Sequence, residues 1–391
     1  MEYIFSNKIA SLKPSAVREI LKSTSDPNVI SLAAGNPAPE AFPIEAVREI
    51  SEKIFREEPI TALQYGVTEG YEPLIHELKS YLKSRHGIGT ETDALIITSG
   101  AQQVMDLVTK VLCNEGDQIA CESPSFIGSL NCFRAYGAEL CGVPVERDGI
   151  DVVALEEVLK NNSKVKFLYT IPNFQNPSGV TMSLEKRKNV YELACKYNIV
   201  ILEDNPYGDL RVSGEPLPTI KSMDTEGRVI YAGTFSKLIA PGLRVGYVCG
   251  PEKIVSKMTV GKQTSDVHTP MFCQLLVYNW MKNYDIDAHI ARMHDIYERK
   301  LNLMCDLIDS ELGSAVTYVK PEGGMFVWCR LNDGIDMLDF CRRAVEKKVA
   351  VVPGTAFLTD EMETTQYIRL NFSTPSDEDI VKGMKLLGEL K

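Results

Sequence analysis

One segment of the sequence, YAGTFSKLIAPGLRVGY at residues 231–247, places an amine among groups that bind phosphate. Lys237 follows the hydroxyl residues Thr234 and Ser236, and Arg244 comes seven positions later. Two hydroxyl donors and a guanidinium fork suit a phosphate ester. A lysine beside such a phosphate is suited to form a Schiff base with a phosphorylated aldehyde, because amines condense with carbonyl groups. The alternative is a solvated loop lysine, which describes most lysines.

Other polar side chains follow further apolar runs, and each has two interpretations. The stretch SGAQ at 99–102 opens a predicted helix whose first N–H groups form an anion site, although a serine N-cap would use the same residues. Asp204 ends the run VILED. It is either a turn carboxylate or the partner of a pyridinium nitrogen. Tyr207 is a turn aromatic or a phenol donor to a ring oxygen. Asn176 is an Asx-turn residue or a ligand donor, and Phe126 belongs to the core or stacks on a flat ring.

The elements that must position these side chains form an alternating pattern. Short apolar runs occur at 94–99, 118–123, 166–172, 200–204, 229–235 and 244–250, with helical patterns between them. Continuous apolar strands interleaved with helices predict an α/β fold with a mostly parallel sheet covered on both faces. Ligands of such sheets lie beyond the carboxyl ends of the strands. The polar groups at four strand ends are therefore expected to meet in one crevice.

The pattern changes in the last third of the chain. A helical stretch from about 271 to 309 is followed by a strand pair within 318–331, a helix near 336–347, strands near 349–353 and 367–372, and a helix from about 376. This order predicts a second, smaller α+β domain. We expect a large ligand-binding domain over residues 46–285 and a small domain formed by residues 1–45 and 286–391.

The composition narrows the class of protein. The 391 residues are 44% hydrophobic and carry a formal net charge of −11, which argues against nucleic acid or an anionic membrane as the main partner. No apolar run approaches the ~20 residues of a membrane span, and the N-terminus has no signal-peptide pattern. The ten cysteines lack C-x-x-C pairs and the five histidines lack H-E-x-x-H spacing. These features predict a cytoplasmic protein with reduced thiols and no metal site.

Ten short motifs resemble, in order, those of the class I and II aminotransferases that use pyridoxal 5′-phosphate and have the type I fold. They are SLAAGNPAPEAFP, LQYGVTEGYEPL, ITSGAQQVMDLV, ESPSF, PNFQNPSG, LEDNPYG, GTFSKLIAPGLRVGY, DVHTP, PEGGMFVW and IRLNFS. Each motif alone is weak, but ten in family order are specific, and they cover nearly the whole chain. FQNPSG, TFSKLIAPGLRVG and DVHTP are most similar to the branch of 2-aminoadipate and kynurenine aminotransferases.

The resemblance implies a role for each candidate residue. Lys237 would hold the cofactor as a Schiff base and move the substrate proton, with Asp204 on the pyridine nitrogen and Tyr207 and Asn176 on the ring hydroxyl. Phe126 would stack on the ring. The phosphate would be bound by Ala101, Gln102, Thr234, Ser236, Arg244 and, from a neighbouring subunit, Tyr65. The substrate would be bound by Arg369 in IRLNFS through its α-carboxylate, by Asn176 and Gly35, and by Arg18, which either meets an acidic side chain or lies on a helix surface.

The implied reaction transfers an amino group from an L-amino acid to a 2-oxo acid, most often 2-oxoglutarate, in a homodimer with shared active sites. Other reactions of the same cofactor, those of a β-lyase, decarboxylase or racemase, are alternatives because the fold hosts all of them. A further alternative is a non-catalytic regulator that binds the cofactor. Its N-terminal DNA-binding domain is not expected here, since SLAAGNP begins by residue 31. Asn36 stands where related enzymes often carry an apolar residue, so the side-chain specificity stays open.

Overall fold

In the computed structural model, which describes residues 3–10, 26 and 28–391, eight strands form one sheet in the order β2-β9-β8-β7-β6-β3-β4-β5. Their bounds are β2 (Asp93–Thr98), β3 (Gln118–Ser123), β4 (Glu139–Glu146), β5 (Gly149–Ile150), β6 (Val165–Thr170), β7 (Val200–Asp204), β8 (Val229–Thr234) and β9 (Gly246–Pro251). The strands from β8 across to β4 run parallel. The strand β9 is antiparallel to both β2 and β8, and β5 is antiparallel to β4. The predicted mostly parallel α/β sheet is confirmed.

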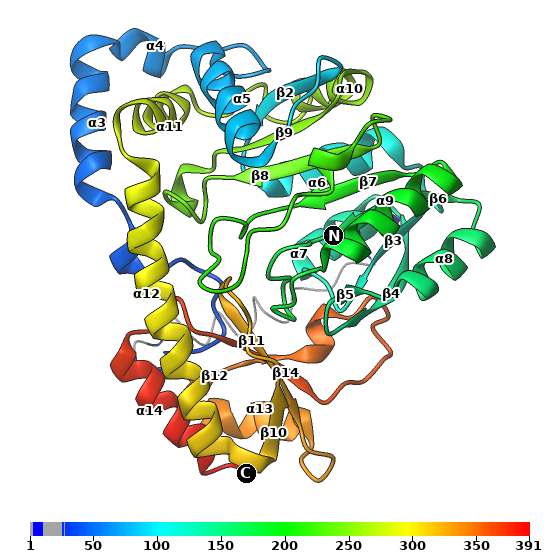
Figure 1. Cartoon of the computed structure of the whole chain (residues 1–391), viewed down its shortest axis with the longest axis vertical. Coiled ribbons are helices and arrows are strands. Elements are labelled where there is room, and N and C mark those ends of the chain that lie inside the picture. The colour runs from blue at the N-terminus through cyan, green and yellow to red at the C-terminus, as the bar shows by residue number, and fades with distance from the viewer. Residues whose placement is uncertain (1–2, 11–25, 27) are drawn as a thin grey trace.

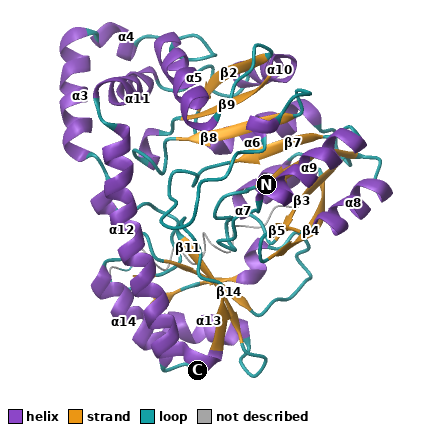
Figure 2. Cartoon of the chain, viewed as in Figure 1, coloured by secondary structure: helices purple, strands orange, loops and turns teal. Residues whose placement is uncertain are grey.

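Helices cover both faces of this sheet (Figures 1 and 2). They are α5 (Glu72–His86), α6 (Ala101–Leu112), α7 (Ile127–Ala135), α8 (Val152–Asn161), α9 (Leu184–Tyr197) and α10 (Glu252–Gln263). Successive side chains of a strand point to opposite faces, and the two apolar clusters divide accordingly. Ile201 packs in the cluster with Leu155 of α8, whereas Leu202 packs in the cluster with Val104 of α6. Burial on both faces explains why these strands are continuous apolar runs in the sequence.

A smaller antiparallel sheet lies below the large one in Figure 1, with strand order β10-β11-β14-β13. Its strands are β10 (Val316–Tyr318), β11 (Phe326–Leu331), β13 (Val352–Pro353) and β14 (Tyr367–Asn371), and β1 (Ile30–Ser31) pairs separately with β12 (Val349–Ala350). The long helix α12 (Ile286–Leu307) runs from the large sheet to the small one and contacts α14 (Asp377–Gly388). These elements bring the C-terminal part of the chain beneath the strand ends of the large sheet.

The remaining helices are mostly short. They are α1 (Asn7–Ala10), η1 (Pro39–Ala41), α3 (Ile44–Glu57), α4 (Pro59–Leu63), η2 (Lys221–Met223), η3 (Pro241–Leu243), α11 (Met271–Asn283), η4 (Ile308–Leu312), η5 (Gly313–Ala315), α13 (Met337–Glu346) and η6 (Gly354–Phe357). In the described part of the chain, no helix is both long enough and apolar enough to cross a membrane.

The structure differs from the predicted elements in several places. The helical stretch 271–309 is interrupted, because the Asp285 side chain accepts a hydrogen bond from the Ala288 amide at 2.9 Å and starts a new helix, α12. The predicted strand 349–353 divides between β12 and β13, which belong to different sheets. The strand β4 was not predicted, since most of its side chains are exposed or half-buried and give no apolar run. The predicted domain limit at 285/286 falls between α11 and α12, and the division into two domains stays a prediction.

Candidate active site

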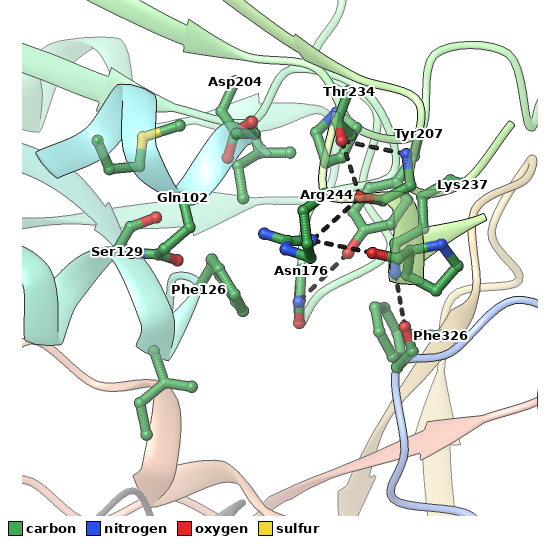
Figure 3. Close-up of a pocket in the computed structure, with 18 of the residues that line it drawn as sticks. Gln102, Phe126, Ser129, Asn176, Asp204, Tyr207, Thr234, Lys237, Arg244 and Phe326 are labelled. Carbon is green, nitrogen blue, oxygen red and sulfur yellow. Dashed lines mark hydrogen bonds between the residues drawn. The ribbon is translucent and has the colours of Figure 1, made fainter. Parts of the chain in front are cut away.

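A cavity of about 440 Å³ lies at the carboxyl ends of β6, β7 and β8, between the two sheets (Figure 3). Its lining residues are Gly35, Ala101, Gln102, Met105, Phe126, Ile127, Ser129, Ile171, Asn176, Asp204, Pro206, Tyr207, Thr234, Ser236, Lys237, Pro241, Arg244, Phe326 and Arg369. Every predicted site residue is among them except Tyr65 and Arg18. Tyr65 is 82% exposed, with its ring edge-on to His268, and Arg18 lies outside the described residues. The strand ends thus meet in one crevice.

Lys237 follows β8 and directs its amine into this cavity. Its Nζ donates a hydrogen bond to the Gly35 carbonyl at 2.7 Å. Burial, together with the nearby charges of Arg369 and Arg244, lowers the pKa of Lys237 to about 8. An amine with this pKa is partly unprotonated near neutral pH, which a nucleophilic lysine requires.

Hydroxyl and guanidinium groups gather at one end of the cavity. The Thr234 hydroxyl donates to Ser236 Oγ at 2.9 Å, and Arg244 Nη1 reaches the same oxygen at 3.5 Å. Figure 3 shows Thr234 and Arg244 on the same side of the cavity as Lys237. The set provides hydrogen-bond donors and one fixed positive charge, which suits a phosphate ester.

The N-terminus of α6 adds backbone donors to this end. The sequence left open a serine N-cap, but the N-cap residue is Gly100, which makes no side-chain capping bond. Gly100 has φ +81°, and a Cβ on it would lie 2.2 Å from Arg244 Nη2, so the close approach of the guanidinium requires glycine. Ser99 instead donates its hydroxyl to Asp266 at 2.5 Å. The first amides of α6 therefore lack a side-chain cap, and Ala101 and Gln102 line the end of the cavity that is suited to an anion.

A buried carboxylate lies deep in the cavity. Asp204 is 4% exposed, and burial raises its pKa to about 7. Its Oδ2 accepts a hydrogen bond from the Tyr169 hydroxyl at 2.8 Å, and that hydroxyl accepts one from Ser129 Oγ at 2.9 Å. Among the described residues, nothing donates to Asp204 Oδ1. An orphaned carboxylate oxygen here is costly unless a ligand supplies a donor.

A second chain of hydrogen bonds joins the large sheet to the small one. Arg369 on β14 donates to Asn176 Oδ1 at 2.8 Å and to the Ala33 carbonyl at 2.7 Å. Asn176 Nδ2 donates to the Tyr207 hydroxyl at 3.4 Å. The Arg369 guanidinium also lies 4.1 Å from the centre of the Phe326 ring, and its Nε has no partner within the described residues. This buried arginine is placed to bind an anionic group that enters the cavity.

The sequence profile "Aminotransferase class I and II" matches residues 27–386 of this chain. The chain belongs to this family. The aminotransferase is 41% identical to the aromatic-amino-acid aminotransferase 1 of Thermococcus litoralis, over 99% of this chain and 94% of that protein. Its fold matches a kynurenine aminotransferase of Pyrococcus horikoshii, solved with PMP, with TM-score 0.94, 40% identity and coverage of 99% and 96%. It also matches the α-aminoadipate aminotransferase of Thermus thermophilus complexed with N-(5′-phosphopyridoxyl)-L-leucine, with TM-score 0.91, 36% identity and coverage of 99% and 96%.

These relatives confirm the predicted family, reaction class and cofactor. The aminotransferase moves amino groups and uses pyridoxal 5′-phosphate. The family and its relatives therefore support transfer of an amino group over the alternatives of a lyase, a decarboxylase, a racemase or a regulator.

The geometry of the cavity fits this cofactor. Uncapped amides and Arg244 lie at the phosphate end, and the orphaned Asp204 Oδ1 is an acceptor for a protonated ring nitrogen. Phe126, at the N-cap of α7, borders the cavity beside Gln102 and Ser129 in Figure 3. The Gln102 side chain donates to the Gly128 carbonyl at 3.0 Å and so points away from an anion at this end. The group of Gln102 that could bind an anion is therefore its backbone amide.

Three residues of the cavity and its hydrogen-bond network were not predicted from the sequence, namely Tyr169, Ser129 and Phe326. Tyr169 lies in an apolar strand and Phe326 in an apolar run, so both look like core residues in the sequence. The one available signal was a phenol inside the buried strand β6, because a buried hydroxyl needs a partner. Asn36 is exposed and does not line the cavity; its carbonyl accepts hydrogen bonds from Ser373 at 2.7 Å and Thr374 at 2.9 Å.

Proposed function

We propose that this aminotransferase uses aromatic L-amino acids as donors and 2-oxoglutarate as the acceptor. The observation that carries the proposal is the character of the cavity wall. Three cations line it, Lys237, Arg244 and Arg369, and the remaining wall includes the apolar residues Met105, Phe126, Ile127, Ile171 and Phe326. The three cations are assigned to the cofactor and to the substrate α-carboxylate, so the wall left for the substrate side chain is apolar. Such a wall favours an amino donor with a large apolar side chain. The aromatic and kynurenine aminotransferases among its relatives support the same donor class.

The contacts support the following roles for the residues of the cavity. The bound cofactor withdraws electrons from the substrate α-carbon. Lys237 would hold the cofactor covalently, and its Nζ, once released, would take the proton from the substrate α-carbon and deliver it to the cofactor carbon. Asp204 Oδ1 would keep the ring nitrogen protonated. Asn176 and Tyr207 would bind the ring hydroxyl, and Arg369 would bind the α-carboxylate, since its Nε has no partner among the described residues.

The second carboxylate of 2-oxoglutarate needs a further cation. Within the described residues, the cavity wall holds no cation beyond those already assigned. For the distal carboxylate we propose Arg18, which the family resemblance assigns to an acidic substrate side chain. The same residue would let glutamate enter in the reverse half-reaction.

We also propose a homodimer in which Tyr65 reaches the cofactor phosphate of the partner subunit. In support, large apolar side chains are exposed along residues 55–67, namely Phe55, Ile60, Leu63, Tyr65 and Val67. Several large apolar side chains exposed within one short segment favour burial of that segment against another protein surface. The free state of all ten cysteines supports the proposed cytoplasmic location.

The experiment is a donor panel with 2-oxoglutarate, in which the product oxo acids are identified and kcat/KM is compared. We expect phenylalanine, tyrosine and kynurenine to exceed alanine and aspartate by at least about tenfold, the worth of one to two buried methylene equivalents. Arg18→Ala should raise KM for 2-oxoglutarate and glutamate and leave phenylalanine unchanged. Higher kcat/KM for acidic donors than for aromatic donors would refute the aromatic preference.

A further inference from the structure

A lysine that the reaction does not use is fully buried beside the phosphate end of the cavity. Lys262, in the last turn of α10, has a side chain with 0% exposure and does not line the cavity. Its Nζ donates to Gln103 Oε1 at 2.7 Å, to both Asp266 oxygens at 2.9 Å and to Thr269 Oγ1 at 3.2 Å. A buried charge is costly unless it is paired and hydrogen-bonded. This ammonium is held by three side chains from two separate segments.

The first of these segments is the start of α6. Gln103 Oε1, which accepts from Lys262, also accepts from the Ser99 amide at 2.8 Å. Asp266 Oδ2, the other partner of Lys262, accepts from the Ser99 hydroxyl at 2.5 Å. Ser99 is thus fixed at its amide and at its side chain by groups that the ammonium holds in place. The Ser99 carbonyl in turn accepts from Arg244 Nη2 at 3.3 Å.

The second segment is the turn at 264–269. The Lys262 carbonyl accepts hydrogen bonds from the amides of Ser265, Asp266 and Val267 at 3.0, 3.1 and 3.2 Å. Val267 has φ +65°, which is strained for a β-branched residue and persists only where its surroundings fix it. Two contacts from Lys262 fix this turn. Its backbone carbonyl accepts from the Val267 amide, and its ammonium donates to Asp266. The turn and the start of α6 are therefore joined through one side chain.

We propose that Lys262 is a positioning residue for cofactor binding, which fixes Ser99 and thereby the α6 amides and the Arg244 guanidinium that bind the phosphate. The proposal rests on the assignment of the phosphate to Arg244 and the start of α6. Lys262 has a second effect, because it neutralises Asp266, whose negative charge would otherwise repel a phosphate dianion nearby. Loss of the ammonium should weaken binding of the phosphate and leave the rest of the cofactor unaffected.

The test compares two probes on the full-length chain after the cofactor is removed, pyridoxal 5′-phosphate and pyridoxal, which lacks the phosphate. Binding is followed by cofactor absorbance and protein fluorescence. Lys262→Met keeps the length of the side chain and removes its charge. We expect its Kd for pyridoxal 5′-phosphate to rise about tenfold or more, the size expected when one member of a coupled polar network is lost, and its Kd for pyridoxal to change less than twofold.

Lys221→Met is the matched control. Lys221 is a second buried lysine, paired with Asp93 at 2.7 Å and Asp224 at 3.0 Å, and it does not line the cavity. Its loss should lower the thermal midpoint and leave the ratio of the two Kd values unchanged. An equal change of that ratio in both lysine variants would overturn the proposal, since it would show a general effect of a lost buried charge.

One further variant separates this proposal from the phosphate assignment on which it rests. Arg244→Met should raise the Kd for pyridoxal 5′-phosphate alone; if it does and Lys262→Met does not, Lys262 has no positioning role and the phosphate site stands. If Arg244→Met changes neither Kd, the phosphate assignment and this proposal both fail.

Should Lys262→Met fail to fold, Ser99→Ala decides between the outcomes, because it removes only the hydroxyl bound to Asp266. A rise of about threefold in the Kd for pyridoxal 5′-phosphate alone supports the proposal, and an unchanged Kd refutes it.

Discussion

The Asp204 carboxylate should destabilise the protein when the cofactor is absent and stabilise it when the cofactor is bound. Burial raises the pKa of Asp204 to about 7, from an ordinary value of 3.8. Between these two values the folded chain without cofactor holds one more proton than the unfolded chain. Its free energy of unfolding therefore falls as the pH rises through that window and stays lower above it. An asparagine at this position carries no charge and avoids the loss.

The size of the effect follows from the difference between the two pKa values. A difference of about 3 units at 1.36 kcal/mol per unit gives about 4 kcal/mol as an upper limit. We expect Asp204→Asn to stabilise the cofactor-free chain by about 2–4 kcal/mol at pH 8.5 and by almost nothing at pH 4. The carboxamide oxygen still accepts the hydrogen bond of Tyr169, so the local packing is kept. With cofactor bound the order reverses, because asparagine does not hold the proton on the ring nitrogen.

The assay is urea unfolding of the wild-type and Asp204→Asn chains, with and without cofactor, at pH 4 and pH 8.5. The exposed Asp295→Asn is the control for loss of a carboxylate that water already solvates. Single-turnover amino transfer by Asp204→Asn should also slow by several orders of magnitude. A cofactor-free Asp204→Asn chain that is no more stable than wild type at pH 8.5 would refute the inferred cost of burial. Equal stabilisation at both pH values would show that its cause is not electrostatic.

Three further predictions concern the lysine, the phenol and the subunit contact. Lys237→Ala should lose the borohydride-reducible attachment of the cofactor and nearly all turnover, whereas the exposed Lys257→Ala should keep both. Tyr169→Phe removes the donor to the Asp204 carboxylate, worth about 1.5–3 kcal/mol, and should slow amino transfer tenfold or more without loss of bound cofactor. Tyr231→Phe, another buried phenol, is its control and should leave the rate unchanged. Tyr65→Ala should raise the Kd for the cofactor about tenfold in a dimer; sedimentation as a fully active monomer would contradict the shared site.

The sequence predicted most reliably those site residues that lie at the carboxyl end of a buried parallel strand. Parallel strands with both faces buried give continuous apolar runs, so the positions of Asp204, Thr234 and the start of α6 followed from general rules for α/β sheets. Arg369 could not be found in this way. It lies on the small antiparallel sheet, and its hydrogen bond to Asn176 joins residues 193 positions apart. Only the family resemblance of IRLNFS identified it.

The residues that the sequence concealed are polar groups whose partners come from distant elements. Lys262 belongs to the helical sequence EKIVSKMTVGKQ, in which it looks like one more surface lysine. Its burial depends on Gln103 from α6 and on a turn whose conformation no local pattern announces. Tyr169 is similar, because its hydroxyl forms hydrogen bonds with Ser129 on α7 and Asp204 on β7, which are far from it in the sequence. Local periodicity predicts which face of an element is buried, but it does not identify a polar network shared among elements.

The two arginines of the cavity link ligand binding to the proton affinity of Lys237. Burial and the charges of Arg369 and Arg244 together lower the pKa of Lys237 to about 8, so the empty cavity holds a larger fraction of the uncharged amine, the form that attaches the cofactor, than a solvated lysine would. On the proposed assignments, the cofactor phosphate neutralises Arg244 and the substrate α-carboxylate neutralises Arg369. Each neutralisation removes one cause of the lowered pKa. The amine therefore gains proton affinity when the substrate is in place, at the stage where it must accept the proton from the α-carbon.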